Sequence, residues 1–222
     1  MASRSKHADP RPVPRLYLLT PRLPETEGFV ASLAEALAAG DVAAVLLRLA
    51  DADERTLINR AKALVPITQA QNAALLLDGH TDLVARAGAD GVHLSGLTDF
   101  AEAMERMKPE RIVGVGGLAT RHDAMLVAEQ GVDYLMFGAP EPAGSQPSFA
   151  AVEEQVAWWA EIFETPCVGY AAGLDEIAPL VDSGADFVAL GDWLWSAPAG
   201  IAATLRAAAA YLRLPDMPEA IG

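Results

Sequence analysis

The 222-residue chain contains very few cysteines and lysines. Cys167 is its one cysteine, which excludes a disulfide framework and a cysteine metal cluster. A single thiol suits a reducing compartment, so we expect a cytoplasmic protein. The three lysines are Lys6, Lys62 and Lys108, and the patterns around them indicate a tail, a helix and a helix end. A Schiff-base aldolase is therefore disfavoured, since its lysine would have to stand at the end of a strand.

Long apolar runs and a basic balance of charge are also lacking. No run approaches the about 20 apolar residues that a membrane span needs, and no signal-peptide core follows the basic start "MASRSKHADPRPVPR". The formal net charge is −14, and 52% of the residues are hydrophobic. Nucleic acid and membrane surfaces are not expected as partners, because both favour a basic protein. A phosphorylated small molecule is compatible with this charge, since a local pocket can be positive.

Eight short apolar segments alternate with amphipathic segments of helical spacing. The first is "RLYLLT" (15–20), and the last is "DFVALGD" (186–192), which a closing helix follows. Strands apolar on both faces that alternate with helices predict an α/β protein with a parallel sheet. We expect a single-domain (β/α)8 TIM barrel over 15–214, with a doubly wound open sheet as the alternative. Residues 1–14 and 215–222 are expected to form a disordered N-terminal tail and a C-terminal tail.

One opening recurs before the second, fourth, sixth and eighth predicted strands. It reads "GADGVHLSG" from 88, "GVDYLMFG" from 131 and "GADFVALG" from 184, with a looser "GDVAAVLLR" from 40. Each glycine, Gly40 included, is expected to end a helix in the left-handed conformation. The aspartate then begins a strand, at the N-terminal face of the barrel, where conserved features serve stability. We therefore interpret Asp90, Asp133 and Asp186 as structural.

Two predicted helices carry further expectations. The segment "DADERTLINRAKALVPITQAQN" predicts a helix that Asp51 or Asp53 caps and that Pro66 kinks or shortens. Another helix, "SFAAVEEQVAWWAEIF", carries Trp158 and Trp159. An apolar helix surface that includes both tryptophans is compatible with a homodimer.

In such a barrel the active site forms at the C-terminal ends of the strands. Asp78 and Asp99 follow neighbouring strands, where two carboxylates can share Mg²⁺. Arg48 leaves the second strand and could clamp phosphate oxygens. The structural alternatives are a turn at Asp78, a helix cap at Asp99, a surface ion pair for Arg48 and an interior packing role for His93. Other candidates at strand ends are Thr20, Arg22, His80, Ser95, Gly116, Gly117, Gly138, Glu141, Ser145, Tyr170, Gly173, Gly191 and Asp192.

The motifs "GADGVHLSG", "IVGVGG", "GVDYLMFG" and "AGLDEIAPLVDSGADFVAL", with the loop "APEP", occur together in one order and spacing. From "LYLLT" to about residue 195 the chain resembles the thiamine-phosphate synthase and thiazole tautomerase family. The resemblance implies coupling of a pyrimidine methyl pyrophosphate to a thiazole phosphate, with Mg²⁺ assisting the departure of pyrophosphate. It implies a metal site at Asp78 and Asp99 and catalytic roles for Arg48 and Asp78. The implied substrate-binding residues are Arg48, His80, His93, Gly138, Gly173, Gly191 and Asp192.

The chain departs from the family pattern where cations are expected. The family's Gln-Leu-Arg-x-Lys stretch corresponds to 46–50, where Arg48 is kept but leucine and alanine replace glutamine and lysine. Leu77 stands in place of an asparagine, and the loop "APEPAGSQPSF" has no lysine. Each lost group typically costs about 10²–10³ in rate, so we expect a divergent synthase with reduced activity. The alternatives are a tautomerase-like enzyme, a non-catalytic binder of a thiamine-related phosphate or protein partner, and another phosphate-handling barrel such as an epimerase.

Overall fold

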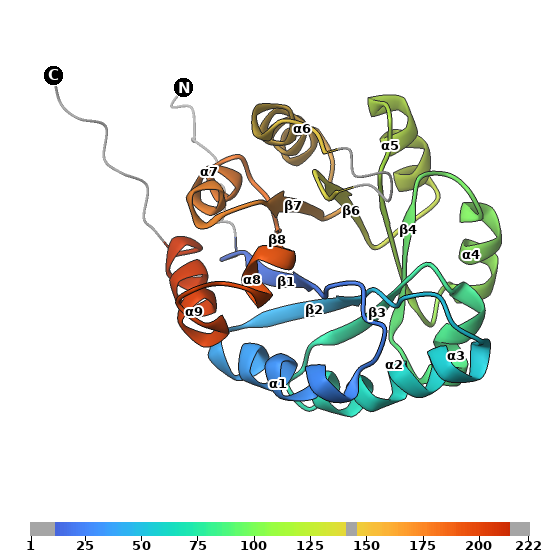
Figure 1. Ribbon diagram of the computed structural model, residues 1–222. Helices are drawn as coiled ribbons and strands as arrows, with labels where there is room; N and C mark the ends of the chain where they lie inside the picture. Colours follow the sequence, from blue (N-terminus) through green and yellow to red (C-terminus); the bar gives the residue numbers. More distant parts are fainter. Residues whose placement is uncertain (1–11, 141–145, 214–222) are drawn as a thin grey trace, which may run out of the picture.

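Eight parallel strands pair in chain order and close on themselves, since β8 also pairs with β1 (Figure 1). The computed structural model describes residues 12–140 and 146–213. The predicted (β/α)8 barrel is therefore confirmed, and the open-sheet alternative is wrong. The strands are β1 (Arg15–Leu19), β2 (Val42–Leu47), β3 (Ala74–Asp78), β4 (Gly91–Ser95), β5 (Ile112–Gly116), β6 (Tyr134–Phe137), β7 (Cys167–Ala171) and β8 (Phe187–Leu190).

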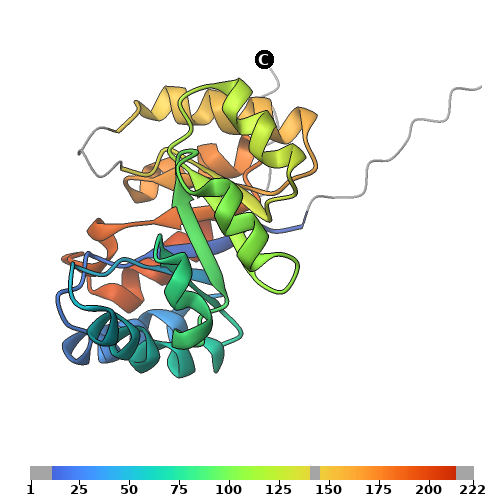
Figure 2. The same ribbon diagram turned by 90° about the vertical axis from the view of Figure 1, so that its right-hand side faces the viewer.

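Helices cover the outside of this barrel (Figure 2). They are α1 (Val30–Ala39), α2 (Glu54–Gln69), α3 (Val84–Ala87), α4 (Phe100–Met107), α5 (Arg121–Glu129), α6 (Phe149–Ile162), α7 (Ile177–Asp182), α8 (Asp192–Trp195) and α9 (Ile201–Tyr211). Short 3-10 turns at 27–29, 81–83 and 174–176 lead into α1, α3 and α7. Helices α1 and α9 lie side by side, so the last described helix closes the ring against the first.

The predicted tails fall mostly outside the described ranges and stay predictions. Residues 12–14 form neither helix nor strand, and the description begins at 12 and ends at 213. Among the helices of the described ranges, none is long and apolar enough to cross a membrane.

Each strand buries both of its faces, as its continuous apolar run predicts. On β1, Leu16 and Leu18 point outward and pack in the layer between the strands and the helices. Tyr17 and Leu19 alternate with them and belong to a second cluster that fills the inside of the barrel. The barrel thus has two apolar cores, one inside the strands and one around them.

The recurring aspartates connect neighbouring strands at the end where the strands begin. Each carboxylate accepts a hydrogen bond from the first or second backbone N–H of the preceding strand. These bonds join Leu75 to Asp90 at 2.7 Å, Val113 to Asp133 at 2.7 Å and Cys167 to Asp186 at 2.8 Å. In the looser copy, Asp41 instead accepts from the Arg15 guanidinium at 2.7 and 2.9 Å. The structural interpretation of the repeat is confirmed, and we call these three carboxylate bonds the aspartate clamps.

The glycine of the repeat takes the expected conformation in three of the four copies. Gly88, Gly131 and Gly184 have φ of 77°, 83° and 94°, the left-handed region that glycine adopts without steric cost. Gly40 contradicts the expectation, because its φ is −164°. A Cβ at this position would lie 2.6 Å from Leu205 Cδ2 of α9. Glycine at 40 therefore serves the packing of α9 against the barrel rather than a left-handed turn.

Helix α2 begins as predicted but passes its proline. Asp53 caps the helix, since its carboxylate accepts from the backbone N–H of Thr56 at 3.0 Å. The helix continues to Gln69, so the expectation that Pro66 shortens it is wrong. Proline sits in the last turn, where one intrahelical bond is lost but its own carbonyl still accepts from Ala70 N at 3.0 Å.

The tryptophans of α6 do not both reach the surface. Trp159 is fully buried and donates from its indole nitrogen to the Thr165 carbonyl at 2.7 Å. Trp158 is half-buried, and the Arg121 guanidinium lies 4.6 Å from the centre of its ring. Trp159 therefore cannot contribute to a dimer surface, which corrects that part of the expectation; a homodimer itself stays a prediction.

The aspartate clamps predict a measurable loss of stability on substitution. In Asp186→Ala the buried N–H of Cys167 loses its acceptor, which should cost about 1–3 kcal/mol in free energy of unfolding. Urea unfolding followed by circular dichroism measures this change. Asp182→Ala is the matched control, because Asp182 is exposed four residues earlier. Equal stability of the two variants would contradict the clamp.

Candidate active site

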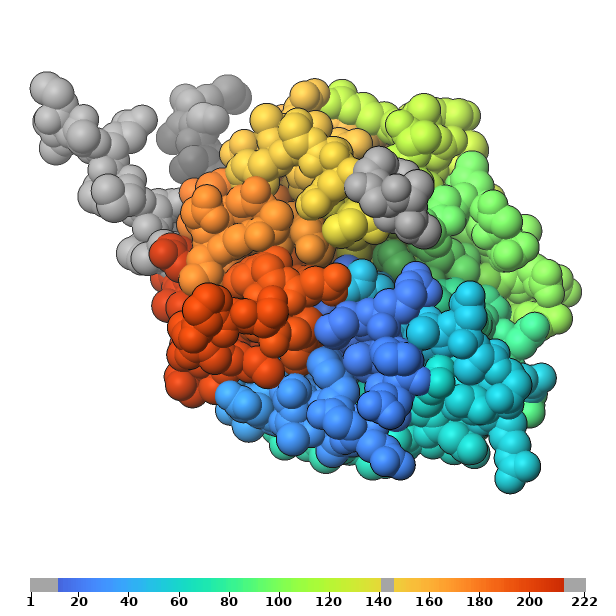
Figure 3. Space-filling model, viewed as in Figure 1, coloured from blue at the N-terminus to red at the C-terminus, as the bar shows by residue number. Residues whose placement is uncertain are grey.

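Two arginines and two aspartates meet at the C-terminal ends of β1, β2, β3 and β8, and we call them the rim cluster: Arg22, Arg48, Asp78 and Asp192. The segments that follow β1 (blue) and β8 (red-orange) lie next to each other on this face of the molecule (Figure 3). Trp195 fastens them, because its indole nitrogen donates to the Leu19 carbonyl at 2.7 Å and its ring contacts Phe29. The rim cluster therefore rests on joined strand ends.

Arg48 is held at the junction between β1 and β2. Its backbone N–H donates to the Thr20 hydroxyl at 3.0 Å, and its Nε donates to the Thr20 carbonyl. Its Nη2 forms an ion pair with Asp192. The arginine side chain is 16% exposed, whereas that of Asp192 is 70% exposed. Arg48 thus forms an ion pair, as the structural alternative expected. Its partner Asp192 is itself a predicted substrate-binding residue, and its exposed side chain can turn toward solvent.

Arg22 supplies a second guanidinium to the cluster. Its Nη1 donates to the Leu49 carbonyl at 3.1 Å, and its Nη2 lies 3.7 Å from the carboxylate of Asp78. The sequence placed Arg22 at a strand end without assigning it a role. Its partner lies on a different strand, and no spacing along the chain predicts that pairing. The missed signal was the residue type itself, a guanidinium three residues after an apolar strand.

Asp78 interacts electrostatically with both arginines. Burial raises the pKa of this carboxyl group above its ordinary value, while Arg22, Arg48 and His80 oppose the rise. Nearby cations stabilise the charged form of Asp78. A metal cation or an anionic ligand that binds beside it would therefore change the pKa of this carboxyl group. The structure therefore brings predicted Asp78, Arg48, His80 and Asp192 into one electrostatic neighbourhood.

His80 and Asp99 lie to one side of this cluster, around a hollow of about 310 Å³ that Asp82 and Glu102 also line. His80 and Asp99 both have left-handed backbones, with φ of 50° and 59°. Asp99 stands at the N-cap position before α4, but its carboxylate makes no capping hydrogen bond, so the alternative of a side-chain cap is wrong. The side chain is therefore not committed to the helix.

Carboxylate oxygens that could bind Mg²⁺ stand at this end of the barrel, but the described ones do not form a cluster. Within the described ranges, no group of three or more histidine, cysteine, aspartate or glutamate residues stands close enough to hold a metal. Mg²⁺ is usually held by only one or two carboxylates together with substrate phosphates and water. Asp78, whose charged form burial disfavours, and Asp99, whose carboxylate the helix does not use, supply oxygen donors of the right kind.

His93 lies inside the barrel below the rim. It is buried, and its Nδ1 is 2.9 Å from the Tyr134 hydroxyl, which is 2.8 Å from the Tyr17 hydroxyl. Desolvation lowers the pKa of His93 to about 4, so the imidazole is neutral at pH 7. Burial raises the pKa of Tyr17 and of Tyr134, so both phenols keep their protons. The interior role is therefore present, and a contact with substrate stays a prediction.

The glycines that the resemblance implies in substrate binding also have packing reasons or local bonds of their own. A Cβ on Gly138 would lie 2.6 Å from a methyl group of Val152, and one on Gly191 would lie 2.3 Å from the Tyr170 hydroxyl oxygen. Gly173 begins the turn before α7. The neighbouring backbone N–H of Ala172 donates to the Glu176 carboxylate at 2.6 Å. An internal carboxylate thus already uses one N–H group at the end of β7.

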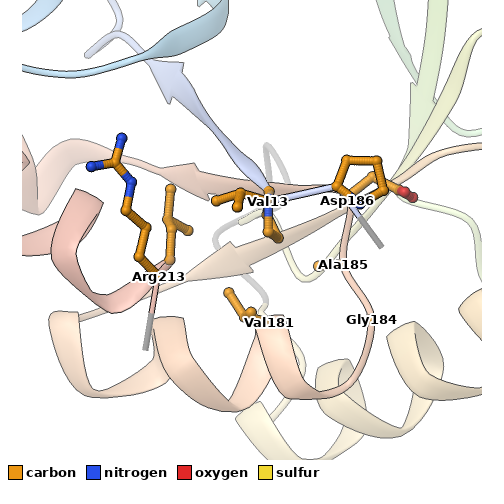
Figure 4. A pocket seen from close by; sticks show the side chains of 9 residues that line it. Val13, Val181, Gly184, Ala185, Asp186 and Arg213 are labelled. Carbon is orange, nitrogen blue, oxygen red and sulfur yellow. The ribbon is translucent and has the colours of Figure 1, made fainter. Parts of the chain in front are cut away.

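A separate hollow of about 240 Å³ lies at the opposite end of the barrel (Figure 4). Val13, Val181 and the Gly184–Asp186 copy of the repeat line it, next to the beginning of β8. Asp186 is committed there to its clamp. This hollow belongs to the stabilising face and adds nothing to the rim cluster. Glu141 and Ser145 lie outside the described residues.

Residues 16–193 match the protein family described as thiamine monophosphate synthase. The chain belongs to this family. It is 43% identical over 194 residues to the thiamine-phosphate synthase of Rhodospirillum centenum, covering 86% of this chain and 94% of the relative. It is 35% identical over 209 residues to that of Hyphomonas neptunium, covering 90% and 94%. The resemblance inferred from the motifs is confirmed.

Solved structures of lower sequence identity share the fold. A thiamine phosphate pyrophosphorylase from Pyrococcus furiosus aligns with a TM-score of 0.75 at 23% identity, covering 89% of this chain and 95% of the other. A 3-hexulose-6-phosphate synthase from Salmonella typhimurium aligns with a TM-score of 0.68 at 18% identity, covering 89% and 98%. The thiamine monophosphate synthase family therefore shares its barrel with enzymes whose names specify other phosphorylated compounds.

The buried histidine predicts a pH dependence of stability. The pKa of His93 is about 4 in the folded protein against an ordinary 6.5, so the unfolded chain binds the proton more readily. Above pH 7 the residue costs nothing, and stability falls as the pH drops from 6.5 towards 4. Between pH 8 and pH 5 it should account for about 2 kcal/mol of lost stability.

Urea unfolding at both pH values checks this expectation. His93→Gln should lose that part of the pH dependence, whereas the exposed control His122→Gln should keep it. The same pH dependence in His93→Gln and the wild type would contradict a buried neutral imidazole.

Proposed function

We propose that this protein is a divergent thiamine-phosphate synthase that acts in thiamine biosynthesis. It would couple a pyrimidine methyl pyrophosphate to a thiazole phosphate. The bond between the methylene carbon and the pyrophosphate oxygen breaks, its electron pair leaves with pyrophosphate, and the thiazole then bonds to that carbon. The observation that carries the proposal is the rim cluster, where Arg22 and Arg48 stand together at the mouth of a family barrel.

Arg22 compensates for part of the lost positive charge. The family's lysine in the second-strand stretch is replaced here, but a second guanidinium from the β1 end faces the same carboxylate, Asp78. A guanidinium presents a planar fork of donors that matches two phosphate oxygens, and it is charged at every relevant pH. Arg22 and Arg48 can therefore neutralise the departing pyrophosphate from two sides.

Asp78 and Asp99 would hold Mg²⁺, which supplies Lewis-acid stabilisation of the leaving pyrophosphate when bound. The residues of the chain orient the rest. Arg48 is fixed by Thr20, so its position does not depend on the substrate. Asp192, which is mostly exposed, would leave Arg48 when phosphate oxygens arrive. Gly173 and Gly191 mark the ends of β7 and β8 that we assign to the thiazole phosphate.

One observation favours a second candidate, a family member that binds the phosphorylated ligand without turnover. Leu46 lies buried inside the barrel and Leu49 is buried beside the rim, at or next to positions where the family carries polar groups. This part of the mouth is apolar and cannot assist a leaving group. A coupling assay run beside calorimetry with thiazole phosphate separates the two functions: turnover supports the synthase, and binding without turnover supports the second candidate.

The rim arginines give the most direct test of the synthase. Arg22→Ala and Arg48→Ala should each lower kcat of the coupling reaction by about 10²–10³, since each removes a preorganised cation from the leaving group. Arg206→Ala, an exposed position on α9, is the matched control and should leave kcat unchanged. If Arg22→Ala couples at the wild-type rate, the compensating role of Arg22 is wrong.

The pair between Arg48 and Asp192 predicts a gain in anion affinity. In Asp192→Asn the guanidinium loses a mostly exposed competitor, and exposed ion pairs are worth about 0–1 kcal/mol. Calorimetry with inorganic pyrophosphate should therefore show about two- to fivefold tighter binding. Asp182→Asn removes one negative charge at an exposed position at the end of α7 and serves as the control. If Asp192→Asn bound pyrophosphate no more tightly than the wild type, Asp192 would not compete with the anion for Arg48.

A further inference from the structure

Tyr170 places a phenol hydroxyl between the ends of β7 and β8, beside the rim cluster. The residue is only 6% exposed, and its ring packs in the cluster that fills the inside of the barrel. Tyr170 is the next-to-last residue of β7, and Ala189 is its register partner on β8. A Cβ on Gly191 would lie 2.3 Å from the hydroxyl oxygen, so the missing side chain just after β8 makes room for this hydroxyl.

The hydroxyl of Tyr170 has a proton to donate, but within residues 12–140 and 146–213 it forms no hydrogen bond. In the same ranges every fully buried side-chain nitrogen or oxygen atom has a partner, so this hydroxyl oxygen is not fully buried. Tyr170 lines a hollow of about 260 Å³ together with Phe149, Val152 and Glu176. A donor whose ring is buried and whose hydroxyl reaches a hollow lacks an acceptor that a bound ligand can supply.

The charged side chains around this hydroxyl indicate how an anionic oxygen can reach it. Burial raises the pKa of Tyr170 above its ordinary value, Asp192 and Glu176 add to the rise, and Arg48 opposes it. The phenol therefore keeps its proton at neutral pH and can donate it. Asp192 acts on Tyr170 and also pairs with Arg48, so an anionic oxygen near its carboxylate interacts with both side chains. When Asp192 turns toward solvent, a phosphate oxygen can take that place.

The strand ends beside this hydroxyl are joined. Trp193 follows β8 and donates from its indole nitrogen to the carbonyl of Ala171, the residue after Tyr170, at 2.9 Å. The ring of Tyr170 is itself packed inside the barrel. The position of the hydroxyl therefore does not depend on a ligand, and such preorganisation lowers the entropy cost of binding.

We propose that Tyr170 is a substrate-binding residue whose hydroxyl donates a hydrogen bond to a phosphate oxygen of the thiazole phosphate, next to the Arg48 guanidinium. The identity of this substrate rests on the proposed function. Its chemical class, a phosphate monoester, rests on the unpaired hydroxyl, the hollow and the neighbouring arginine. A phosphate group has enough oxygens to bind Arg48 and Tyr170 at once. It would replace the Asp192 carboxylate on Arg48 and add the bond to Tyr170.

Calorimetry on the full chain tests this contact with two ligands that differ only in the phosphate. Tyr170→Phe keeps the ring and removes the hydroxyl, so it should bind the thiazole phosphate about tenfold more weakly than the wild type, as expected for one hydrogen bond to a charged group. The thiazole alcohol, which lacks the phosphate, should bind both proteins with affinities within about twofold of each other. Tyr211→Phe, an exposed tyrosine at the end of α9, is the matched control and should bind like the wild type. An equal loss for the phosphate and the alcohol, or no loss for either, would overturn the proposal.

Carbon NMR reads the phenol itself in the intact protein. The chain has four tyrosines, and after ¹³C labelling at Cζ the signal that is missing in Tyr170→Phe belongs to Tyr170. Inorganic phosphate should shift this signal and leave that of Tyr211 in place. A Tyr170 signal that stays unchanged at the highest phosphate concentration would mean that the hydroxyl bonds only to water, and would overturn the proposal. A wild type that binds the thiazole phosphate without coupling it would refute the proposed synthase activity and leave the role of Tyr170 to these two measurements.

Discussion

The aspartate clamps fix how neighbouring strands meet, and the rest of the barrel depends on that register. Asp90, Asp133 and Asp186 each tie the beginning of an even-numbered strand to the odd-numbered strand before it. A carboxylate that accepts a backbone N–H restricts sliding along the strand direction, and a slip of one residue would exchange the inward and outward faces. Because stability is secured at this end, the opposite ends of the strands can carry groups that are costly to hold together.

The rim cluster is such a costly arrangement. Arg22 and Arg48 stand beside Asp78 on a protein with a net charge of −14. Burial raises the pKa of Asp78, and Arg22, Arg48 and His80 offset only part of that rise. Two further carboxylates occupy donors at this end of the barrel. Asp192 pairs with Arg48, and Glu176 accepts a hydrogen bond from the backbone N–H of Ala172. Internal anions thus occupy contacts that suit phosphate oxygens, so a phosphorylated ligand must compete for groups that are already paired.

The sequence predicted the fold well because the fold depends on patterns that are local. Apolar runs, helical spacing and the glycine–aspartate repeat led to the barrel and to the structural role of Asp90, Asp133 and Asp186. Gly40 shows the limit, since its reason is a contact with Leu205 on a helix 165 residues later. Pro66 shows another, because its effect depends on how near the helix end it falls. Arg22 was missed for the same reason as Gly40: its partner lies on another strand.

The interior of the barrel links these two levels. Every second residue of a strand faces the inside of the barrel, and Gly114 and Gly116 occupy two successive inward positions on β5. Their missing side chains leave the space that Tyr134 and His93 fill. Tyr134 directly follows the clamping residue Asp133, so the contact that sets the register of β6 also sets the height of the phenol in the barrel. His93 stands three residues after Asp90 in the same way. The repeat therefore stabilises the scaffold and also positions His93 and Tyr134 inside the barrel. A shift of register in β4 or β6 would separate the His93 imidazole from the Tyr134 hydroxyl.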